Sequence, residues 1–292
     1  MILRIGFFCS TSDNRLTTNR KIKLQNLSYD NVLKTFIKNL ADLKSLLEYS
    51  KNHGFEIFRI GSNLIPLFSH EKFKDSWKYE IEDILKKEKH TIKNYGIRLT
   101  MHPGQYVILN SPDPKVVKQS IAELEYHVFV LDTLETDLNS IIIIHVGGKY
   151  GNKEKSIERF INTIEKYPNI KRRLAIENDD KTYSVRDVLQ ISKYTRIPVV
   201  FDYYHHMLNF SEFDLDELIQ TWKDRIPKFH ISSQGKKKYQ HSEYLEKQDF
   251  TNFIEFLSPL MKSDITIDIM PEVKMKEKSS SIILNWIREH KT

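Results

Sequence analysis

Histidine and acidic residues occur at corresponding places in this sequence, namely at the ends of short apolar runs or soon after them. They are His70, His102, His145, Glu177, Asp202, His205, His230, His241 and Glu272. Because Cys9 is the only cysteine, a metal ion would be held by imidazole and carboxylate groups, which suit manganese, zinc or magnesium. Two ions about 4 Å apart can hold the attacking and leaving oxygens of a phosphodiester in line. The pattern therefore predicts a site for more than one divalent ion.

A single histidine near a strand end is more often a hydrogen-bonded structural residue than a metal ligand. Here, however, six or seven of the 11 histidines, with His206 undecided, fall at the ends of the apolar runs or in the loops that directly follow them, and the others fall in the expected helices or at their ends. That bias favours a metal site over six separate structural roles.

Lys228 lies two residues before His230, so alternation along a strand places both side chains on the same face, pointing into the fold. An ammonium group beside several cations would be strongly unfavourable. Three states avoid this conflict: a neutral amine, an ammonium that faces a substrate phosphate, and a carbamate, which is itself an anionic ligand. The remaining alternative is an outward-facing lysine on a strand of shifted register.

Eight short runs rich in β-branched and apolar residues divide the chain, and each is followed by a longer polar or helical stretch. They comprise residues 3–8, 55–61, 97–102, 140–146, 173–178, 198–203, 227–232 and 265–273. Eight repeats of strand and helix predict a (β/α)8 TIM barrel, an α/β fold whose active sites form at the carboxyl ends of the strands. An open doubly wound sheet is the alternative. No Pro-, Gly- or Ser-rich linker interrupts residues 1–292, which predicts a single domain.

The helices are predicted from apolar residues that recur three or four positions apart. The clearest helix follows Ser28, and others are predicted over residues 116–134, 157–164, 185–191, 250–260 and 282–287. Ser28, Asp113 and Ser184 are of the type that caps a helix N-terminus, and Pro114 suits a first helical turn. The second and the sixth helices have the weakest patterns.

The composition is that of a globular protein with a mild preference for polyanions. Hydrophobic residues make up 40% of the chain and charged residues 29%, and 45 Lys and Arg against 39 Asp and Glu give a net charge of +6. Clustered basic residues attract phosphate groups, although many ordinary enzymes are equally basic. The N-terminal run, Met1 to Phe8, is too short and too soon followed by polar residues to be a signal peptide, and no later apolar run approaches the roughly 20 residues of a membrane span. We therefore expect a cytoplasmic protein without membrane contact.

Several of the candidate residues lie in motifs that together resemble the UV damage endonuclease family. The motifs are Arg59-Ile60-Gly61-Ser62 leading to Pro66 and His70, Met101-His102-Pro103-Gly104-Gln105-Tyr106, His145-Val146-Gly147-Gly148, Glu177-Asn178-Asp179-Asp180, Asp202 with His205-His206, and Lys228-Phe229-His230-Ile231-Ser232-Ser233-Gln234. The resemblance extends from about Arg4 to Glu277. It implies a metal-dependent barrel, like endonuclease IV and xylose isomerase in architecture, that nicks DNA 5′ of ultraviolet photoproducts and other distorting lesions.

The resemblance also implies roles for individual residues. The nine histidine and acidic residues named at the outset match the family's metal ligands. Lys228 matches a position where the family carries a carboxylated lysine, which favours the carbamate. Two or three ions per chain are implied, with manganese favoured and zinc or magnesium as alternatives. Glu177, Lys228 and His230 are then the expected catalytic residues.

Gln105 and Tyr106 match the pair with which the family probes the damaged site. Insertion of an aromatic ring at a lesion is physically reasonable, because damaged bases have already lost stacking energy. The alternative for Tyr106 is a tyrosine that only packs on its own loop. Where the family can carry a tyrosine and a further polar probe residue, this chain has Phe7 and Thr11. That departure affects the expected lesion preference more than the cutting chemistry.

The resulting hypothesis is hydrolysis of damaged double-stranded DNA with the help of bound metal ions, leaving a 3′ hydroxyl and a 5′ phosphate. Lys236, Lys237 and Lys238 are expected to contact flanking phosphates without reading base sequence. We expect a monomer that needs no protein partner and associates with the nucleoid through DNA.

Two other functions fit parts of the sequence. A metal-dependent sugar isomerase or epimerase could be built on the same barrel from Glu177, Asp202, His230 and Glu272 alone. A protein that binds damaged DNA without cutting it is the other, although an open metal site would be needless there.

Overall fold

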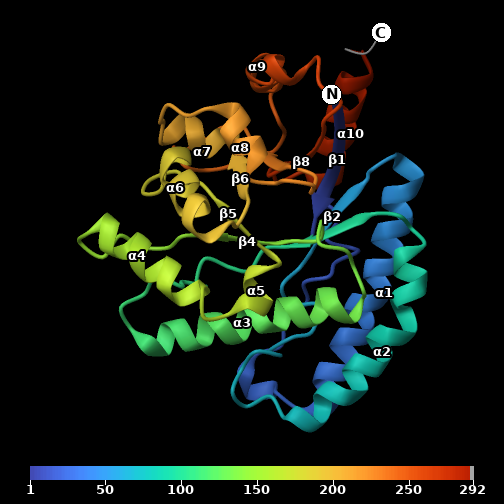
Figure 1. Cartoon of the computed structure of the whole chain (residues 1–292). Coiled ribbons are helices and arrows are strands. Elements are labelled where there is room, and N and C mark those ends of the chain that lie inside the picture. Colours follow the sequence, from blue (N-terminus) through green and yellow to red (C-terminus); the bar gives the residue numbers. More distant parts are fainter. Residues whose placement is uncertain (290–292) are drawn as a thin grey trace.

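The eight predicted strands close into a barrel (Figure 1). The computed structural model describes residues 1–289 of the 292. The strands are parallel and follow sequence order, and β1 pairs with both β2 and β8. They are β1 (Ile2–Phe8), β2 (Ile57–Ile60), β3 (Arg98–Met101), β4 (Ile142–His145), β5 (Leu174–Glu177), β6 (Val199–Asp202), β7 (Lys228–Ile231) and β8 (Thr266–Pro271). The predicted (β/α)8 barrel is confirmed, and the open doubly wound sheet is wrong.

Helices connect the strands and lie outside the barrel (Figure 1). They are α1 (Tyr29–His53), α2 (Asp75–Lys93), α3 (Pro114–Thr133), α4 (Lys153–Ile164), α5 (Pro168–Lys171), α6 (Val185–Thr195), α7 (Tyr203–Leu208), α8 (Leu215–Gln220), α9 (Lys247–Phe256) and α10 (Lys276–Glu289). Short 3-10 turns cover Leu24–Asn26 and Ser258–Leu260. Ser28 caps α1 and Asp113 caps α3, each by accepting a hydrogen bond from a first-turn N–H. Ser184 begins α6, where its backbone N–H donates to Asp187 at 2.8 Å.

The two helices with the weakest sequence patterns differ from each other in the structure. α2 is a continuous helix of 19 residues that buries only Ile81, Leu85 and Ile92, so its apolar stripe is narrow. The connection after β6 contains two short helices, α7 and α8, of six residues each. α7 begins directly at the end of β6, because Asp202 ends the strand and also accepts a hydrogen bond from the His205 N–H at 2.8 Å. This junction fixes His205 beside the strand end.

Alternation along the strands separates an apolar outer layer from a largely polar barrel interior. Outward residues such as Ile5, Phe58 and Ile144 pack beneath the helices in the main hydrophobic core. A smaller apolar cluster lies inside the barrel. It contains inward residues of β4, β5 and β6 (Ile143, Ala175 and Val200), Ile141 directly before β4, and Trp222. Several other inward positions carry charged side chains, among them Arg59, Lys228 and Asp268.

A buried ion network occupies the amino-terminal end of the interior. Asp268 on β8 is fully buried and accepts hydrogen bonds from Arg4 Nε at 2.6 Å, Arg4 Nη2 at 2.9 Å and Arg98 Nη1 at 2.6 Å. Arg98 also donates to the backbone oxygens of Asn139 and Ile226. Buried charges of this kind are stable only when they are paired and hydrogen-bonded. The network therefore fastens β1, β3 and β8 together on the side away from the strand ends that carry the candidate ligands.

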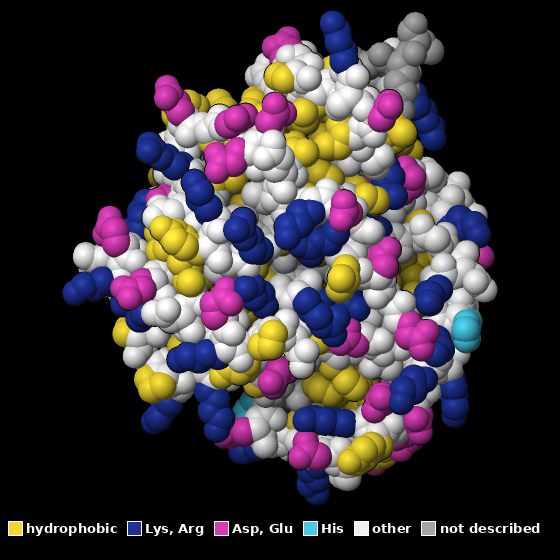
Figure 2. Space-filling view, viewed as in Figure 1, with side chains coloured by type: hydrophobic (Ala, Val, Ile, Leu, Met, Phe, Trp, Pro, Cys, Tyr) yellow, Lys and Arg dark blue, Asp and Glu magenta, His cyan; other side chains and the backbone are white. Residues whose placement is uncertain are grey.

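Surface charge does not by itself mark a binding face. Figure 2 shows Lys and Arg side chains mixed with Asp and Glu over the whole of the viewed face. The functional site must therefore be located from the geometry of particular side chains. As for membranes, none of the helices within residues 1–289 combines the length and the apolar character that a bilayer span requires.

Candidate metal centre

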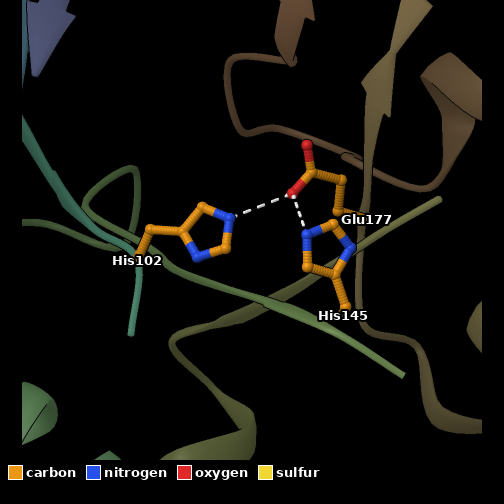
Figure 3. A group of neighbouring side chains, drawn as sticks. All are labelled: His102, His145 and Glu177. Carbon is orange, nitrogen blue, oxygen red and sulfur yellow. Dashed lines mark hydrogen bonds and ion pairs between the residues drawn. The ribbon is translucent and has the colours of Figure 1, made fainter. Parts of the chain in front are cut away.

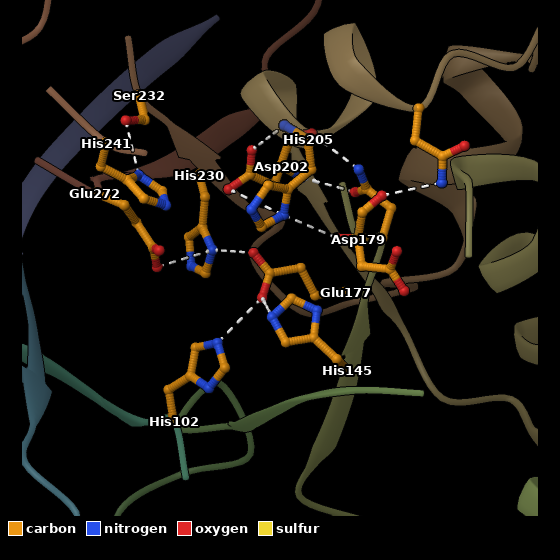
Figure 4. Close-up of polar contacts among 12 residues, drawn as sticks. His102, His145, Glu177, Asp179, Asp202, His205, His230, Ser232, His241 and Glu272 are labelled. Atoms are coloured by element: carbon orange, nitrogen blue, oxygen red, sulfur yellow. Dashed lines mark hydrogen bonds and ion pairs between the residues drawn. The ribbon is translucent and has the colours of Figure 1, made fainter. Parts of the chain in front are cut away.

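The carboxyl ends of six strands bring most of the predicted ligands together around Glu177 (Figure 4). Three groups have possible ligand atoms within 4.8 Å of one another: His102, His145 and Glu177; Glu177, Asp202 and His205; and Glu177, His230 and Glu272. Glu177 belongs to all three groups. Seven of the nine histidine and acidic residues predicted from the sequence thus meet at one mouth of the barrel.

Glu177 ends β5 with its side chain directed into the barrel and is only 1% exposed. Its Oε1 accepts a hydrogen bond from His230 Nδ1 at 2.5 Å, and its Oε2 accepts one from His102 Nε2 at 3.1 Å. His145 Nε2 lies 3.4 Å from the same Oε2 (Figure 3). Burial alone would raise the pKa of this carboxyl group, but the His230, His145 and His102 rings hold it well below its usual range. Glu177 is therefore an anion surrounded by imidazoles.

The His102 ring is suited to bind a cation. Burial lowers the pKa of His102 to about 4, so its ring is neutral near pH 7. The neutral imidazole is the form that binds metal ions.

Asp202 and His205 are held in place by Asn178, the residue after Glu177. The Asn178 side-chain amide makes two hydrogen bonds of 2.9 Å with the backbone of Asp202, and His205 Nδ1 donates to the Asn178 backbone oxygen at 3.1 Å. Burial opposes a charge on His205, but Asp202, Glu177 and Glu272 together raise its pKa to about 9. Asn178 was not predicted as a site residue, because its role is to orient the neighbouring ligands.

Arg59 is a site residue that reasoning from strand ends missed. It points inward from β2, where its Nη2 donates to Glu272 Oε1 at 2.5 Å and to His230 Nε2 at 2.9 Å. The guanidinium also lies over the Phe8 ring, 5.5 Å from its centroid. Arg59 thus joins two of the candidate ligands. The available signal was its inward position by strand alternation, since Phe58 and Ile60 on either side face the outer core.

Lys228 points into the barrel, so the alternative of an outward lysine on a shifted strand is wrong. The side chain is fully buried, and its Nζ donates to Thr100 Oγ1 at 2.7 Å. Burial, with Arg59 and Arg98 nearby, holds the pKa of Lys228 well below its usual value. An ordinary ammonium group is therefore disfavoured at this position.

His70 and His241 lie outside the three groups. His241 Nδ1 is 2.8 Å from Ser232 Oγ, and its ring centroid is 6.1 Å from that of His205, so it borders the cluster. His70 lies in the loop after β2, where its Nδ1 accepts a hydrogen bond from the Lys72 N–H at 3.1 Å. Within residues 1–289, no hydrogen bond, ion pair or ring contact joins His70 to the other candidate ligands. Their roles as ligands stay predictions.

The donor atoms of the cluster fit divalent metal ions. Asp202 Oδ2 is buried and has no hydrogen-bond partner among the described residues, although His205 Nδ1 lies 3.6 Å away. His145 Nδ1 is likewise buried without a hydrogen-bond partner in the described part of the chain. Unpaired buried polar atoms are costly unless a ligand or a water meets them. Imidazole and carboxylate donors of this kind suit manganese, zinc or magnesium.

Most of the predicted DNA contacts lie at accessible positions. Gln105 and Tyr106 are exposed on the loop after β3, and Tyr106 is 62% exposed. Residues 236–238, the three lysines, are exposed on the loop after β7. Thr11 is half-buried in the turn after β1, where its hydroxyl donates to Asp13 at 2.7 Å. These positions are open to a nucleic acid strand, and the contacts themselves stay predictions.

Phe7 is not available to DNA, and its predicted role as a lesion contact is wrong. The side chain is fully buried beneath α1, with its ring centroid 6.0 Å from Tyr49, 5.5 Å from Phe55 and 5.2 Å from Phe58. Because Arg4 points into the barrel, alternation directs Phe7 outward into the layer beneath the helices.

The sequence matches one protein family over nearly its whole length. A family model described as UV-endonuclease UvdE matches residues 8–290. The chain belongs to this family. A UV DNA damage endonuclease of Clostridium perfringens is 38% identical over 298 residues, covering 98% of this chain and 71% of that protein. One of Bacillus thuringiensis subsp. konkukian is 34% identical over 311 residues, covering 99% of this chain and 95% of that protein.

Solved structures agree with membership of the UV-endonuclease family. The crystal structure of SacUVDE has a TM-score of 0.90 and 40% sequence identity, covering 99% of both chains. D-psicose 3-epimerase from Clostridium cellulolyticum H10 has a TM-score of 0.57 at 16% identity, covering 85% of this chain and 93% of that one. A family 2 AP endonuclease from Brucella melitensis has a TM-score of 0.54 at 12% identity, covering 98% of both. The last two likenesses are of fold alone. The family inferred from the sequence motifs is confirmed by the family model and by the likeness to SacUVDE.

Proposed function

We propose that this chain is a metal-dependent endonuclease that nicks double-stranded DNA on the 5′ side of ultraviolet photoproducts and other distorting lesions. The observation that carries this proposal is the convergence of seven histidine and acidic side chains around Glu177 at the mouth of the barrel. Membership of the UV-endonuclease family, with relatives named UV DNA damage endonucleases, supports damaged DNA as the substrate. The products are a 3′ hydroxyl and a 5′ phosphate.

The three groups that share Glu177 would hold two or three divalent ions, with manganese favoured and zinc or magnesium as alternatives. His70 and His241 would complete the ligand set from the loops after β2 and β7. When bound there, the ions would supply polarisation of the phosphodiester, activation of water and compensation of charge on the leaving oxygen. Because Glu177 takes part in every group, its charge affects each ion.

The side chains of the site orient one another before a substrate arrives. Glu177 fixes the His230 and His102 rings through hydrogen bonds of 2.5 and 3.1 Å, and Arg59 joins Glu272 to His230 through hydrogen bonds of 2.5 and 2.9 Å. Contacts of this kind hold the side chains close to one another, so that little movement is needed to form a metal site. Glu177, His230 and Lys228 are the residues that we assign to catalysis.

Lys228 is proposed to carry a carbamate and to act as an additional anionic ligand. The likeness to the UV damage endonuclease motif around Lys228-Phe229-His230 supports this assignment, as does a side chain that is buried within the barrel. The measurement is the mass of the Lys228 peptide under non-acidic conditions. An increment equal to carbon dioxide is expected, and an unmodified lysine in fully active protein would contradict the assignment.

DNA would reach the site along the exposed loops. Gln105 and Tyr106 would probe the distorted bases, since a lesion has already lost part of its stacking energy. The lysines at residues 236–238 would contact phosphates beside the lesion and add affinity without base selectivity. We further propose that the protein acts as a monomer, without a protein partner, on DNA in the nucleoid of the cytoplasm.

A nicking assay tests the proposed function. With manganese present, the chain should nick an ultraviolet-irradiated duplex much faster than the unirradiated one, and DNA ligase should reseal the nick because the ends are a 3′ hydroxyl and a 5′ phosphate. Equal inactivity on both duplexes would contradict the proposal. Turnover of a ketose would instead favour the isomerase, and tight binding to irradiated DNA without nicking would favour a damage-binding protein.

A further inference from the structure

The loop that carries Gln105 and Tyr106 is fastened to one face of α3. Ser120 and Glu123 lie three residues apart on that helix, so their side chains project from the same face. Ser120 Oγ accepts a hydrogen bond from the Ile108 N–H at 2.8 Å, and Glu123 Oε1 accepts one from the Tyr106 hydroxyl at 3.2 Å. The tip and the return of the loop therefore depend on adjacent positions of one helix.

The Glu123 carboxylate also reaches a second loop. Its Oε2 accepts a hydrogen bond from the hydroxyl of Ser69, the residue that precedes His70 in the loop after β2. Glu123 is 8% exposed although it lies on an outer helix. A buried carboxylate that bonds two separate loops is placed to set their positions, rather than to keep the helix soluble.

Tyr106 rests in a position that is not suited to stacking within DNA. A Cβ atom added at Gly104 would lie 2.5 Å from Tyr106 Cε1, so one side of the ring rests against the backbone of its own loop. Burial, followed by the Glu123 charge, raises the pKa of Tyr106 to about 12, so the hydroxyl stays protonated and can donate. A ring that inserts between bases must leave both this backbone contact and the carboxylate.

We propose that Glu123 is a positioning residue that limits the affinity for lesions by holding Tyr106 retracted over Gly104. This inference rests on the proposed function, in which Tyr106 probes damaged DNA. At a lesion, the lowered cost of unstacking offsets the loss of the Tyr106–Glu123 hydrogen bond, and the ring inserts. In intact DNA the bases remain stacked, and the ring stays on its loop. Glu123 thus sets part of the free-energy cost of inserting the ring at a lesion.

Equilibrium binding tests this role without depending on the cutting step. The metal-loaded full chain is titrated with two duplexes whose target linkages are non-hydrolysable methylphosphonates, one with a photoproduct and one undamaged. The variants are Glu123→Gln, Tyr106→Phe and the two combined. Glu125→Gln is the matched control, because Glu125 is exposed on the same helix and its replacement removes the same charge.

Glu123→Gln is expected to tighten binding to the lesion duplex by about threefold. Glutamine offers its amide oxygen to only one of the Tyr106 and Ser69 hydroxyls, and a bond that it keeps with Tyr106 loses the strength added by the negative charge. Binding to the undamaged duplex should stay within about twofold, since the ring remains retracted in that complex. Glu125→Gln should match the wild type on both duplexes. In the Tyr106→Phe background, Glu123→Gln should have no further effect, because the hydroxyl through which it acts is gone.

Two results overturn the inference. One is an unchanged lesion affinity in Glu123→Gln. The other is an equal change in lesion affinity with and without the Tyr106 hydroxyl, which a merely structural role would give. If Glu123→Gln does not fold, Tyr106→Phe alone decides, because it removes the same hydrogen bond and spares the Ser69 contact. Lesion affinity that fails to rise in Tyr106→Phe then overturns the inference. A wild type that binds both duplexes equally would refute lesion recognition itself, and the role of Glu123 with it.

Discussion

Replacement of Glu177 by glutamine should abolish most nicking while the protein stays folded. The two side chains have nearly the same shape, so the perturbation is confined to one negative charge and one acceptor atom. In the wild type the two carboxylate oxygens accept hydrogen bonds from His230 and His102. Glutamine can satisfy one of these donors, and it turns its amide group toward the other.

The size of the effect follows from this geometry. A buried ring N–H that faces an amide N–H₂ is left unpaired, which should lower the free energy of unfolding of the metal-free protein by about 1–3 kcal/mol. Loss of one preorganised electrostatic contact in an active site slows a reaction by roughly 10²- to 10³-fold. Because Glu177 belongs to all three ligand groups, nicking should slow at least this much.

Single-turnover nicking of a photoproduct duplex at saturating manganese measures the rate, and urea denaturation measures stability. Glu212→Gln is the control, since Glu212 is exposed in the segment between α7 and α8. The Glu177→Gln protein should still bind the lesion duplex, because the exposed loops are unchanged. A folded Glu177→Gln protein that nicks within about tenfold of the wild-type rate would refute the role of Glu177 as the shared ligand.

Three further changes test other parts of the molecule. Chelation of metal should abolish nicking and lower the thermal unfolding midpoint, and added manganese should restore both; differential scanning fluorimetry and a nicking assay check this, and indifference to the chelator would contradict it. Alanine at residues 236–238 should weaken binding to damaged and undamaged duplexes alike and reduce the slope of log affinity against log salt by up to about 0.9 per lysine; an unchanged slope would exclude these lysines from phosphate contact. Asp268→Asn should lower the free energy of unfolding in urea by about 3–5 kcal/mol, because Arg4 and Arg98 lose their buried counter-charge, and a loss under about 1 kcal/mol would show that the network is not what stabilises this end of the barrel.

Strand ends were enough to predict most of the candidate site. In a parallel barrel every strand ends at the same mouth, and alternation fixes which residues face inward. Glu177, Asp202 and His230 therefore had to converge once their strands were recognised. The weak pattern of the sixth helix also has a structural counterpart, since the connection after β6 contains two helices of six residues each and not one long helix.

The errors at Phe7 and Arg59 share one origin. Phe7 was assigned from its family position and Arg59 was missed by reasoning from strand ends, because the alternation of inward and outward residues along β1 and β2 was left unused. That alternation places Arg4 inside and Phe7 outside on β1, and it places Arg59 inside on β2. Applying this alternation to β1 and β2 would have corrected both errors.

Other parts of the site could not be read from the sequence. Contacts between loops depend on backbone paths that no residue pattern specifies, so neither the distance of His70 from the cluster nor the hydrogen bond between Tyr106 and Glu123 was predictable. Glu123 in particular has the spacing and type of an ordinary helix surface residue. The prediction that residues 1–292 form one domain is likewise still to be tested, and residues 290–292 lie outside those that the structure describes.

Metal content is the most direct test of a shared metal centre. Purified wild type and Glu177→Gln are equilibrated with manganese, freed of unbound metal by gel filtration, and measured by inductively coupled plasma mass spectrometry. Two or three divalent ions per wild-type chain are expected, with a clear loss in the variant, because each ligand group includes Glu177. A wild type that retains less than one ion per chain, or a variant that retains as many as the wild type, would contradict the metal centre proposed at the mouth of this barrel.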